Sequence, residues 1–493
     1  MTVMPNWLKQ RAFLTPERTA ISDGKRTKTF AELYEAAASW ARRLAGAGVK
    51  EGDIVAVLMK NSVEMIEIVH ALFLLGARAL LQNARLTPYE LCWQLDDSGA
   101  RVVIADDDLA GRFGGDGRVI TVSALTAFAE ADALLKETHH LDETATIMYT
   151  SGTTGTPKGV LQTYGNHWWS AVGSALNLGL HERDCWLASV PLFHISGWSI
   201  AMRSVIYGMP MQLQTSFDAK AANTLIMDGK VTVMSVVAAM LQRMVSELGA
   251  ARYPDTFRCM LLGGGPAPQP LLEACKEKGI PVYQTYGMTE TASQIVTLAP
   301  EYSLTKLGSA GKPLFPAELR IVRDGKPAAP YEAGEIVVKG PNVTKGYLHR
   351  PEATAQAIRD GWFYTGDIGY VDEEGFLYVL DRRSDLIISG GENVYPAEIE
   401  AVLLAHPDVE EAGVTGVEDE TWGQVPCAFV KLKQGAAAAE DELKQFCRSR
   451  LAKYKVPARI YFVPALPRNA AQKLLRRELK TLIPEAEQRA SRR

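Results

Sequence analysis

Hydrophobic and polar positions alternate in two periods along residues 1–305. A helical spacing of apolar residues follows the capping-box pair Thr29 and Glu32, until "GAGVKEGD" stops the helix. The runs "IVAVLM" and "RVVIADD" are bounded by turn residues and rich in branched side chains, as buried strands are. The strand–helix order returns in "KVTVMSVVAAMLQRMVSEL" and in "FRCMLLGGGPAPQPLLEACKEKGIPVYQTYGMTE". This pattern predicts two doubly wound α/β layers.

The pattern changes in the last third of the chain. Residues 306–380 carry short apolar runs between Gly and Pro turns, such as "AGEIVVKG" and "GFLYVLD", which favour a small β-barrel. A helix that begins at Pro396, a strand "CAFVKLK", a helix "DELKQFCRSRLAKY" and a strand "RIYFV" then form a compact α+β unit. We therefore predict an α/β protein with a large N-terminal domain at 1–380, a hinge at 381–385 and a small C-terminal lid domain at 386–493.

The most hydrophobic run, "IEIVHALFLLGARALL", is interrupted by Glu67, His70 and Arg78 and is too short to span a bilayer. We interpret it as a core helix. The N-terminal stretch lacks the apolar segment of a signal peptide, and the basic "EAEQRASRR" at the other end has no apolar face. We expect no stable membrane association.

Composition narrows the class of protein. The chain has 493 residues, 47% hydrophobic and 22% charged, which fits a globular protein of two or three domains. A net charge of -4 gives no reason to expect a nucleic-acid partner. The six cysteines are scattered without a C-x-x-C pair, which indicates reduced thiols and a cytoplasmic location. No sequence pattern settles whether the chain forms a homo-oligomer.

The stretch "TIMYTSGTTGTPKGV", residues 146–160, is the first candidate for chemistry. It follows an apolar run and joins hydroxyls and glycines to one cation, Lys158. Such a composition is typical of flexible surface loops, but after a strand it favours a phosphate cradle. A Walker A loop is excluded, because Pro157 and Gly159 stand where the second glycine and the metal-binding hydroxyl belong. We predict a nucleotide loop of another type.

Three further motifs lie at the ends of apolar runs. "GGGPAP", residues 263–268, is weak alone, since it fits a tight turn as well as a ligand-facing backbone. "YGMTE", residues 286–290, joins an aromatic ring, a hydroxyl and a carboxylate, which could stack a purine, bind phosphate and hold Mg²⁺. "FYTGD" ends at Asp367, which alone would be an ordinary turn residue.

Taken together, the ordered motifs "YTSGTTGTPKG", "YGMTE", "YTGD", "DRRSDLIISGGENVYP" and "LPRNAAQKLLR" resemble those of the adenylate-forming superfamily. This superfamily contains acyl-CoA synthetases, luciferases and peptide-synthetase adenylation domains, and the resemblance covers essentially the whole chain. Within it, "NWLKQRAFLTPER", "PLFHISG", "LLGGGPAP", "QTYGMTETASQIVTL" and "KLGSAGKPLF" are most similar to the o-succinylbenzoate–CoA ligases of menaquinone biosynthesis.

The resemblance implies a ligase reaction in two steps. A carboxylate attacks the α-phosphate of Mg·ATP and releases pyrophosphate, and coenzyme A, the co-substrate, then attacks the acyl-adenylate and releases AMP. Because step one brings two anions together, positioned cations and N–H donors must offset their repulsion.

The resemblance also assigns residues by motif. Thr289 would bond the α-phosphate, Glu290 would bind Mg²⁺, and Lys473 would bridge the attacking carboxylate and the α-phosphate. Tyr286 would lie against adenine, while Asp367 and Arg382 would take the ribose. The remaining nucleotide-binding positions are Thr150, Ser151, Gly152, Thr153, Thr154, Lys158, Gly264, Gly265, Gln284 and Gly287. Without the resemblance, Lys473 would be a solvated surface lysine.

Two departures concern the rotation of the lid domain that the resemblance implies. Gln472 replaces the usual glycine before the catalytic lysine, and the hinge position falls on Ser384, with Asp385 next to it. The lid backbone at Gly390 and Gly391 would border the coenzyme A channel. We take Ser384 as the hinge residue.

The stretch "PLFHISGWSIAMRSVIYGM" gives information on the carboxylic acid that the protein would bind. If a helix begins near Ser196, then Ile200, Arg203 and Tyr207 share one face, and Arg203 is the only charge in the segment. A buried guanidinium needs an anion. One interpretation is an internal Asp or Glu; the other is the second carboxylate of a dicarboxylic substrate.

His194 would border the reacting acyl group, although a packed structural histidine is an alternative. The other candidates to line the acid pocket are Ser196, Ser235, Val237, Gly265, Thr289 and Ser293.

Two rival functions stay open from the sequence. One is an acyl-CoA synthetase for another aryl or medium-chain acid, which shares every nucleotide residue but gives Arg203 nothing to bind. The other is a non-catalytic sensor of nucleotide or acyl ligands, which has no need of Glu290 and Lys473. Luciferase-type oxidation and a peptide-synthetase module are weaker fits.

Overall fold

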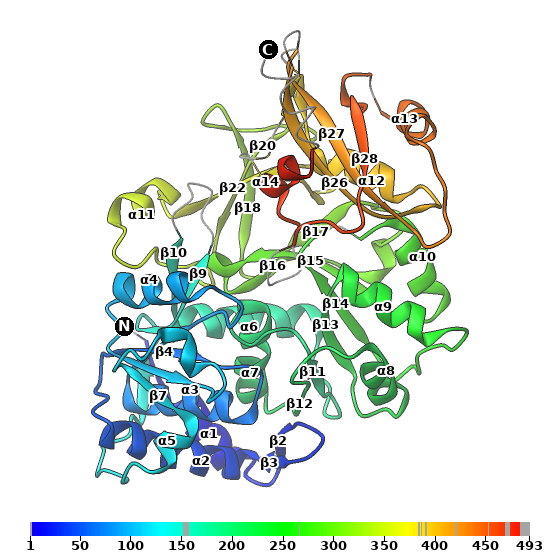
Figure 1. Cartoon of the computed structure of the whole chain (residues 1–493). Helices are drawn as coiled ribbons and strands as arrows, with labels where there is room; N and C mark the ends of the chain where they lie inside the picture. Colours follow the sequence, from blue (N-terminus) through cyan, green and yellow to red (C-terminus); the bar gives the residue numbers. More distant parts are fainter. Residues whose placement is uncertain are drawn as a thin grey trace.

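The computed structural model describes residues 2–150, 157–265, 267–382, 385, 387–389, 392–419, 422–451, 453–468 and 474–483. For residues 381, 382, 388, 392, 393 and 423 it describes the backbone alone. Figure 1 shows an N-terminal α/β layer in blue and cyan beside a second layer in green, with the C-terminal unit in orange and red above them. The predicted α/β class and the two layers are confirmed.

The first layer is a six-stranded sheet in the order β10-β9-β5-β4-β6-β7, parallel except for the antiparallel edge strand β10. Its strands are β4 (Ile54–Leu58), β5 (Arg78–Leu81), β6 (Val102–Ala105), β7 (Val119–Thr121), β9 (Thr144–Thr150) and β10 (Lys158–Thr163). The helices of this part are α1 (Trp7–Leu14), α2 (Phe30–Gly46), α3 (Val63–Leu75), α4 (Pro88–Ser98) and α5 (Val122–Thr126), and a separate pair joins β1 (Val3–Pro5) to β8 (Thr138–His140).

Local sequence explains where these helices begin and end. The predicted capping box is present: the Thr29 side chain accepts from the Glu32 N–H, and the Glu32 carboxylate accepts from the Thr29 N–H. The prediction of one helix for residues 66–81 is wrong in its second half. Helix α3 ends at Gly76, whose φ of 72° is left-handed, and Arg78–Leu81 forms strand β5. Continuous apolar runs do not separate a buried helix from a buried strand.

The second layer is built on parallel strands that end in an antiparallel extension. Its strands are β2 (Thr19–Ser22), β3 (Thr27–Thr29), β11 (Trp186–Ala188), β12 (Met211–Leu213), β13 (Val233–Val237), β14 (Cys259–Gly263), β15 (Val282–Met288) and β16 (Ser293–Leu298). Its helices are α6 (Tyr164–Leu178), α7 (Ile195–Tyr207), α8 (Ala219–Met227), α9 (Ala238–Leu248) and α10 (Gln269–Glu277). The N-terminal strand β2 pairs in parallel with β12, Ile21 opposite Met211.

The residues expected to form a small barrel continue this second sheet. The pairing runs on from β16 through β17, β23, β22, β20 and β18 to β19 as an open path, so one hydrogen-bonded sheet carries both parts. These elements are β17 (Ser309–Pro313), β18 (Glu318–Arg323), β19 (Lys326–Pro327), β20 (Gly334–Lys339), β21 (Ile358–Arg359), β22 (Trp362–Val371), β23 (Leu377–Arg382) and helix α11 (Pro351–Ala357). The extension brings "YTGD" on β22 toward "YGMTE" at the end of β15.

The strands after residue 386 form a separate sheet with its own core. Its strands are β24 (Ile387–Ser389), β25 (Glu392–Val394), β26 (Val409–Asp419), β27 (Gly423–Leu432) and β28 (Arg459–Phe462), and its helices are α12 (Pro396–Leu404), α13 (Glu440–Arg448) and α14 (Arg476–Leu479). Helix α12 begins at Pro396 as predicted and contacts β23 of the large part. Among the described helices, none is long and apolar enough to cross a membrane.

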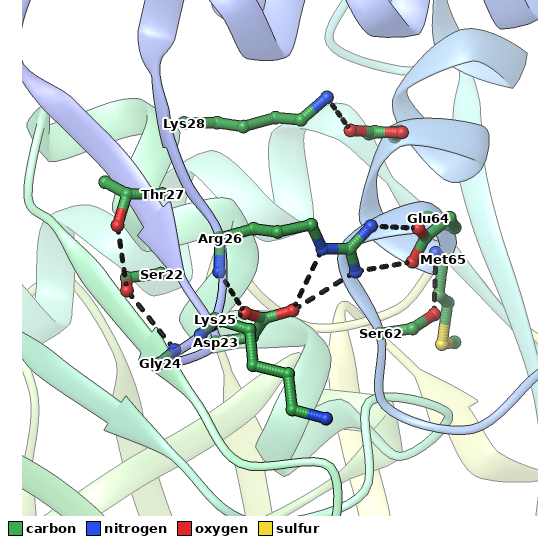
Figure 2. A network of polar contacts seen from close by, with 11 residues as sticks. Ser22, Asp23, Gly24, Lys25, Arg26, Thr27, Lys28, Ser62, Glu64 and Met65 are labelled. Carbon is green, nitrogen blue, oxygen red and sulfur yellow. Dashed lines mark hydrogen bonds and ion pairs between the residues drawn. The ribbon is translucent and has the colours of Figure 1, made fainter.

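The hairpin β2–β3 is joined to helix α3 of the first layer by the ion pairs drawn in Figure 2. Arg26 donates to both oxygens of Glu64 and to the carboxylate of Asp23. The Ser62 hydroxyl caps the same helix at the Met65 N–H. Because the Arg26 side chain is 50% exposed, these pairs orient the hairpin more than they stabilise it.

Candidate active site

The strand-loop-strand that carries the predicted phosphate cradle is a hairpin of β9 and β10. Thr150 ends β9 and lies opposite Lys158, the first residue of β10. The loop positions Ser151, Gly152, Thr153 and Thr154 lie outside the described residues. The described geometry therefore fixes the two ends of the loop at the carboxyl end of β9, where parallel sheets present ligands.

One aromatic residue, Tyr347, contacts both Lys158 and the carboxylate of the "YGMTE" motif. The Lys158 ammonium group is 5.2 Å from the ring centre of Tyr347. The Tyr347 hydroxyl donates to Glu290 Oε1 at 3.1 Å. Burial, with the Glu290 charge second, raises the pKa of Tyr347, so the hydroxyl stays protonated and donates. The structure thus brings together one cation and one carboxylate from segments far apart in the sequence.

The predicted adenine and ribose positions also come together. The Tyr286 hydroxyl donates to Asp367 Oδ2 at 2.8 Å, and Asp367 lies opposite Arg382 in the pairing of β22 with β23. The side chain of Arg382 lies outside the described part. Gln284, on the same strand as Tyr286, is buried, and its Nε2 has no hydrogen-bond partner within the described ranges. A buried donor of this kind is satisfied when a ligand supplies an acceptor.

Backbone geometry explains why glycine stands at two of the predicted positions. Gly264 follows β14 with a φ of 87°, and a Cβ there would lie 3.3 Å from Val237. A Cβ at Gly287 would lie 2.0 Å from the carbonyl oxygen of Ser293, because β15 and β16 approach closely. Gly287 is therefore required by strand packing whatever the nucleotide contacts. Gly265 is exposed beside Gly264.

Arg203 lies where the acid-pocket interpretation requires it. Helix α7 begins at Ile195, one residue from the predicted start, and Arg203 is 2% exposed. Its Nη2 donates to Ser170 Oγ at 3.3 Å, its guanidinium lies 5.3 Å from the Trp186 ring centre, and its Nε has no partner among the described residues. Burial lowers the pKa of the Arg203 guanidinium, and nearby Tyr207 acts in the opposite direction.

No carboxylate of the described part pairs with Arg203, so the internal-acid alternative finds no support there. Trp186, which faces the guanidinium, donates through Nε1 to Ser235 Oγ at 3.1 Å. Ser293 lies 3.4 Å from Ser199 of α7, measured between the hydroxyl oxygens. Arg203, Ser235 and Ser293 thus share one neighbourhood around α7, whereas Ser196 is exposed.

His194 precedes α7, and its imidazole contacts the ring of Phe193. Its Nε2 is buried and has no partner in the described ranges. Burial, with the positive charge of Arg85 second, lowers its pKa to about 4, so the imidazole is neutral near pH 7. A neutral ring with one unpartnered nitrogen suits contact with a ligand better than a purely packed role.

Several predicted positions cannot be placed. Lys473, Ser384, Gly390 and Gly391 lie outside the described residues. What is described beside the hinge is Asp385, which pairs with Arg476 Nη1 at 3.4 Å. Arg476 also pairs with Glu400 of α12, Nη2 to Oε2 at 2.6 Å. Asp385 is therefore tied to the small domain.

The donor set near Glu290 fits magnesium. Within the described ranges, no group of three or more His, Cys, Asp or Glu side chains could hold a metal by itself. Mg²⁺ is commonly held by one or two carboxylates together with substrate phosphates, which agrees with a single glutamate beside a phosphate loop.

Residues that the sequence did not single out complete the neighbourhood. Tyr347 contacts Glu290, and Trp186 covers Arg203. Gln162, Ser170 and Asn342 donate hydrogen bonds to backbone carbonyls at the end of "YGMTE" and directly after it. Gln162 lies on β10, Ser170 on α6 and Asn342 in the loop after β20, and nothing in the local spacing indicates which backbone carbonyl each of them bonds.

Comparison with known proteins agrees with this geometry. The AMP-binding enzyme family model matches residues 8–348, and the AMP-binding enzyme C-terminal domain model matches residues 398–473. The chain is 84% identical to the 2-succinylbenzoate–CoA ligase of Geobacillus kaustophilus over 99% of this chain and 100% of that protein. It resembles o-succinylbenzoate CoA synthetase (MenE) from Bacillus subtilis bound to the acyl-adenylate intermediate OSB-AMP, with 53% identity, a TM-score of 0.93 and coverage of 97% and 99% of the two chains.

The same Bacillus subtilis enzyme in complex with ATP and magnesium ion gives a TM-score of 0.93, with 97% of this chain and 100% of that chain covered. With two family models that span both of its parts and relatives of this similarity, the chain belongs to the AMP-binding enzyme family.

Proposed function

We propose that this protein is an ATP-dependent acid–CoA ligase that converts o-succinylbenzoate, ATP and coenzyme A to o-succinylbenzoyl-CoA, AMP and pyrophosphate in menaquinone biosynthesis. Relatives that carry this activity in their names support the reaction, the first of them 84% identical over 99% of this chain. The single observation in the structure that carries the choice of acid is Arg203, a fully buried cation without an acidic partner in the described part.

The energetics of Arg203 support a dicarboxylic substrate. An unpaired buried guanidinium costs several kcal/mol, and an ionised group that enters the pocket offsets this cost with charge-assisted hydrogen bonds. o-Succinylbenzoate has two carboxylates, of which one is activated and the other stays ionised. A hydrophobic aryl or medium-chain acid would leave Arg203 buried and unpaired, which disfavours that alternative.

In the first half-reaction an oxygen of the substrate carboxylate attacks the α-phosphorus of ATP, and the bond from that phosphorus to the pyrophosphate oxygen breaks. We assign Lys158 and the hydroxyls at 150–154 to the leaving phosphates, Thr289 to the α-phosphate, and Asp367, Tyr286 and Arg382 to the nucleoside. Magnesium, when bound through Glu290, supplies positive charge to the phosphates. Lys473 would bridge the two reacting anions.

His194 has a defined part in this proposal. Because its pKa lies at about 4, the ring carries no charge that would compete with Arg203 for a carboxylate. It offers one nitrogen to the reacting acyl group and fixes its position. In the second half-reaction the thiol of coenzyme A loses its proton, its sulfur attacks the acyl carbon, and AMP departs with the bonding electrons. The lid backbone at Gly390 and Gly391 would border the thiol. We expect the reaction to occur in the cytoplasm.

The decisive experiment is acid-dependent exchange of labelled pyrophosphate into ATP without coenzyme A. The acids are o-succinylbenzoate, benzoate, 4-coumarate, acetate and octanoate. We expect exchange with o-succinylbenzoate alone. Exchange with a different acid would keep the ligase mechanism and overturn the substrate. Binding of Mg·ATP without exchange for any acid would favour the sensor alternative.

A further inference from the structure

The segment Thr289–Ala292 carries the Thr289 hydroxyl and the Glu290 carboxylate, which the proposed function assigns to the α-phosphate and to magnesium. Each of its four backbone carbonyl oxygens accepts a hydrogen bond from another element. Gln162 Nε2 donates to the Thr289 oxygen at 2.8 Å, and the Thr344 N–H donates to the Glu290 oxygen at 2.7 Å. Asn342 Nδ2 donates to the Thr291 oxygen at 3.0 Å, and Ser170 Oγ donates to the Ala292 oxygen at 2.6 Å. The donors come from β10, α6 and the loop after β20.

The segment needs fastening because its backbone is strained. Ala292 has a φ of 51° and Ser293 a φ of 100°, conformations that residues with a Cβ rarely adopt. Each such residue is destabilising and persists only where surrounding contacts hold it. Here the hydrogen bonds from β10, α6 and the loop after β20 stabilise this backbone conformation.

The amide of Gln162 is oriented by its own partners. Its Oε1 accepts from Thr146 Oγ1 at 2.8 Å, so its Nε2 points to Thr289. The Thr146 hydroxyl has a single proton, so it must accept from His167 Nε2, which lies 2.9 Å away. Burial, with the charge of Arg203 second, lowers the pKa of His167 to about 3, which keeps this ring neutral. Gln162 is 0% exposed, so water cannot replace it.

Ser170 links the segment to the acid pocket. Its hydroxyl proton goes to the Ala292 oxygen, so its lone pairs are available to Arg203 Nη2 at 3.3 Å. The same side chain thus contacts the proposed carboxylate-binding arginine and the end of the strained segment.

We propose that Gln162, Asn342 and Ser170 are positioning residues for adenylation: they hold Thr289 and Glu290 at the positions from which these groups meet the α-phosphate and magnesium, and Ser170 aligns this segment with Arg203. This inference rests on the proposed function. It makes catalytic geometry depend on three buried side chains outside the nucleotide motifs.

The test compares matched pairs of buried amides. Gln162→Met is paired with Gln82→Met, because Gln82 is equally buried and donates to the Leu91 carbonyl at 3.2 Å away from the segment. Asn342→Ala is paired with Asn223→Ala, because the Asn223 amide donates to the Met244 carbonyl at 2.9 Å in the second layer. The measurements are the thermal midpoint, the rate of pyrophosphate exchange and its dependence on Mg²⁺ concentration.

Gln162→Met and Gln82→Met should lose similar thermal stability, because each removes two hydrogen bonds of a buried amide. Asn223→Ala should lose at least as much as Asn342→Ala, because the Asn223 amide oxygen also accepts from the Tyr253 hydroxyl. Exchange should fall by about tenfold to a hundredfold in Gln162→Met and Asn342→Ala alone, with a raised Mg²⁺ requirement and little change in the KM for the acid. Ser170→Ala should raise that KM as well. Equal loss of exchange in both members of a pair, or an unchanged Mg²⁺ dependence, would overturn the inference.

The substrate assignment and the positioning role are tested by separate experiments. The acid panel on the wild-type protein decides the substrate, and the variants are then compared with whichever acid supports exchange. If no acid does, the affinity for Mg·ATP is measured by calorimetry on the same pairs. A selective loss in Gln162→Met and Asn342→Ala supports the inference, and parallel behaviour within pairs contradicts it.

Discussion

Arg203 and Arg258 are two arginines of the second layer with opposite environments. Arg258 pairs with the buried carboxylate of Asp184 and donates through Nη1 to the Leu178 carbonyl at 2.6 Å. Arg203 is more deeply buried, and within the described part it faces the Ser170 and Tyr207 hydroxyls and an aromatic ring but no carboxylate. A paired arginine stabilises the fold, whereas an unpaired buried one costs stability until an anion arrives. This contrast gives a prediction with an internal control.

Arg203→Met should raise the KM for o-succinylbenzoate by about tenfold to a hundredfold, since a charge-assisted hydrogen bond is lost. The same change should leave the thermal midpoint of the free protein unchanged or higher, because an uncompensated charge is removed. Arg258→Met should do the reverse: it leaves Asp184 unpaired, lowers the midpoint and spares the KM. An unchanged KM in Arg203→Met would refute the anion-pairing role.

Four histidines whose pKa is lowered by burial give the stability a pH dependence. Burial is the largest cause in each case, and it lowers the pKa to about 3 for His70 and His167 and to about 4 for His139 and His194. The unfolded chain binds protons near pH 6.5 while the folded chain does not, so stability is full above that value and falls as pH decreases toward 4.

We expect the free energy of unfolding, from urea titrations at pH 7.5 and 5.5, to decrease on acidification. His70→Leu should reduce the slope by about 1 kcal/mol per pH unit below pH 6.5, because one titrating group is removed. His70 is assigned no catalytic role, so the activity at pH 7.5 provides a check that the fold is intact. A slope identical to that of the wild type would show that His70 has the same pKa in the folded and unfolded chains, against the predicted effect of its burial.

At the scale of elements, helix α7 is the part that carries the acid pocket, and its first turn is packed against the chain before it. A Cβ at Gly197 would lie 2.2 Å from the carbonyl oxygen of Pro191. His194 lies between these two positions, so the close approach of helix and preceding turn determines where its ring lies. Substitution at Gly197 must push the two apart.

Gly197→Ala should cost about 1–3 kcal/mol of stability, as overpacking does, and should lower the exchange rate because His194 moves. The matched change is Gly111→Ala, where a Cβ would meet no atom within 4 Å. That control should be neutral or slightly stabilising. Circular dichroism melts and exchange assays on both variants measure this, and loss of stability without loss of rate would separate packing from catalysis.

Elements were the most predictable part of the structure, for a physical reason. The capping box of α2, the Pro396 start of α12 and the helical face of Arg203 all depend on local spacing, which sequence contains. The pattern of residues 66–81 does not separate helix from strand, because both halves are buried on all sides and lose their periodicity. Gln162, Ser170 and Asn342 could not be found, because a side-chain bond to a distant carbonyl leaves no periodic trace.

At the scale of the whole molecule, the boundary at 381–385 stays a prediction, and Asp385 bears on it. Through Arg476 the Asp385 carboxylate is connected to Glu400 of α12, whose Oε1 accepts from the Val414 N–H. We expect a residue fastened in this way to move with the small domain. A pivot is therefore expected just before it, at Ser384.

Ser384→Pro should fix φ at the pivot and hold the lid in one orientation. Exchange of pyrophosphate into ATP should be preserved, while thioester formation should fall by about tenfold or more. Ser384→Ala serves as the control and should affect neither. The two half-reactions are measured separately, and equal loss in both would place the pivot elsewhere.

The pairing of β2 with β12 has a consequence for the order in which the protein can be made. Ile21 leaves the ribosome about 190 residues before its partner Met211, roughly 10–40 s at usual synthesis rates. The first sheet, complete at Thr163, can close in that interval, while the hairpin β2–β3 stays without its neighbour. Its ion pairs with Glu64 in Figure 2 involve only residues already synthesised. They can therefore orient the hairpin against α3 before β12 is made, so that the edge of β2 is already in place when its partner strand arrives.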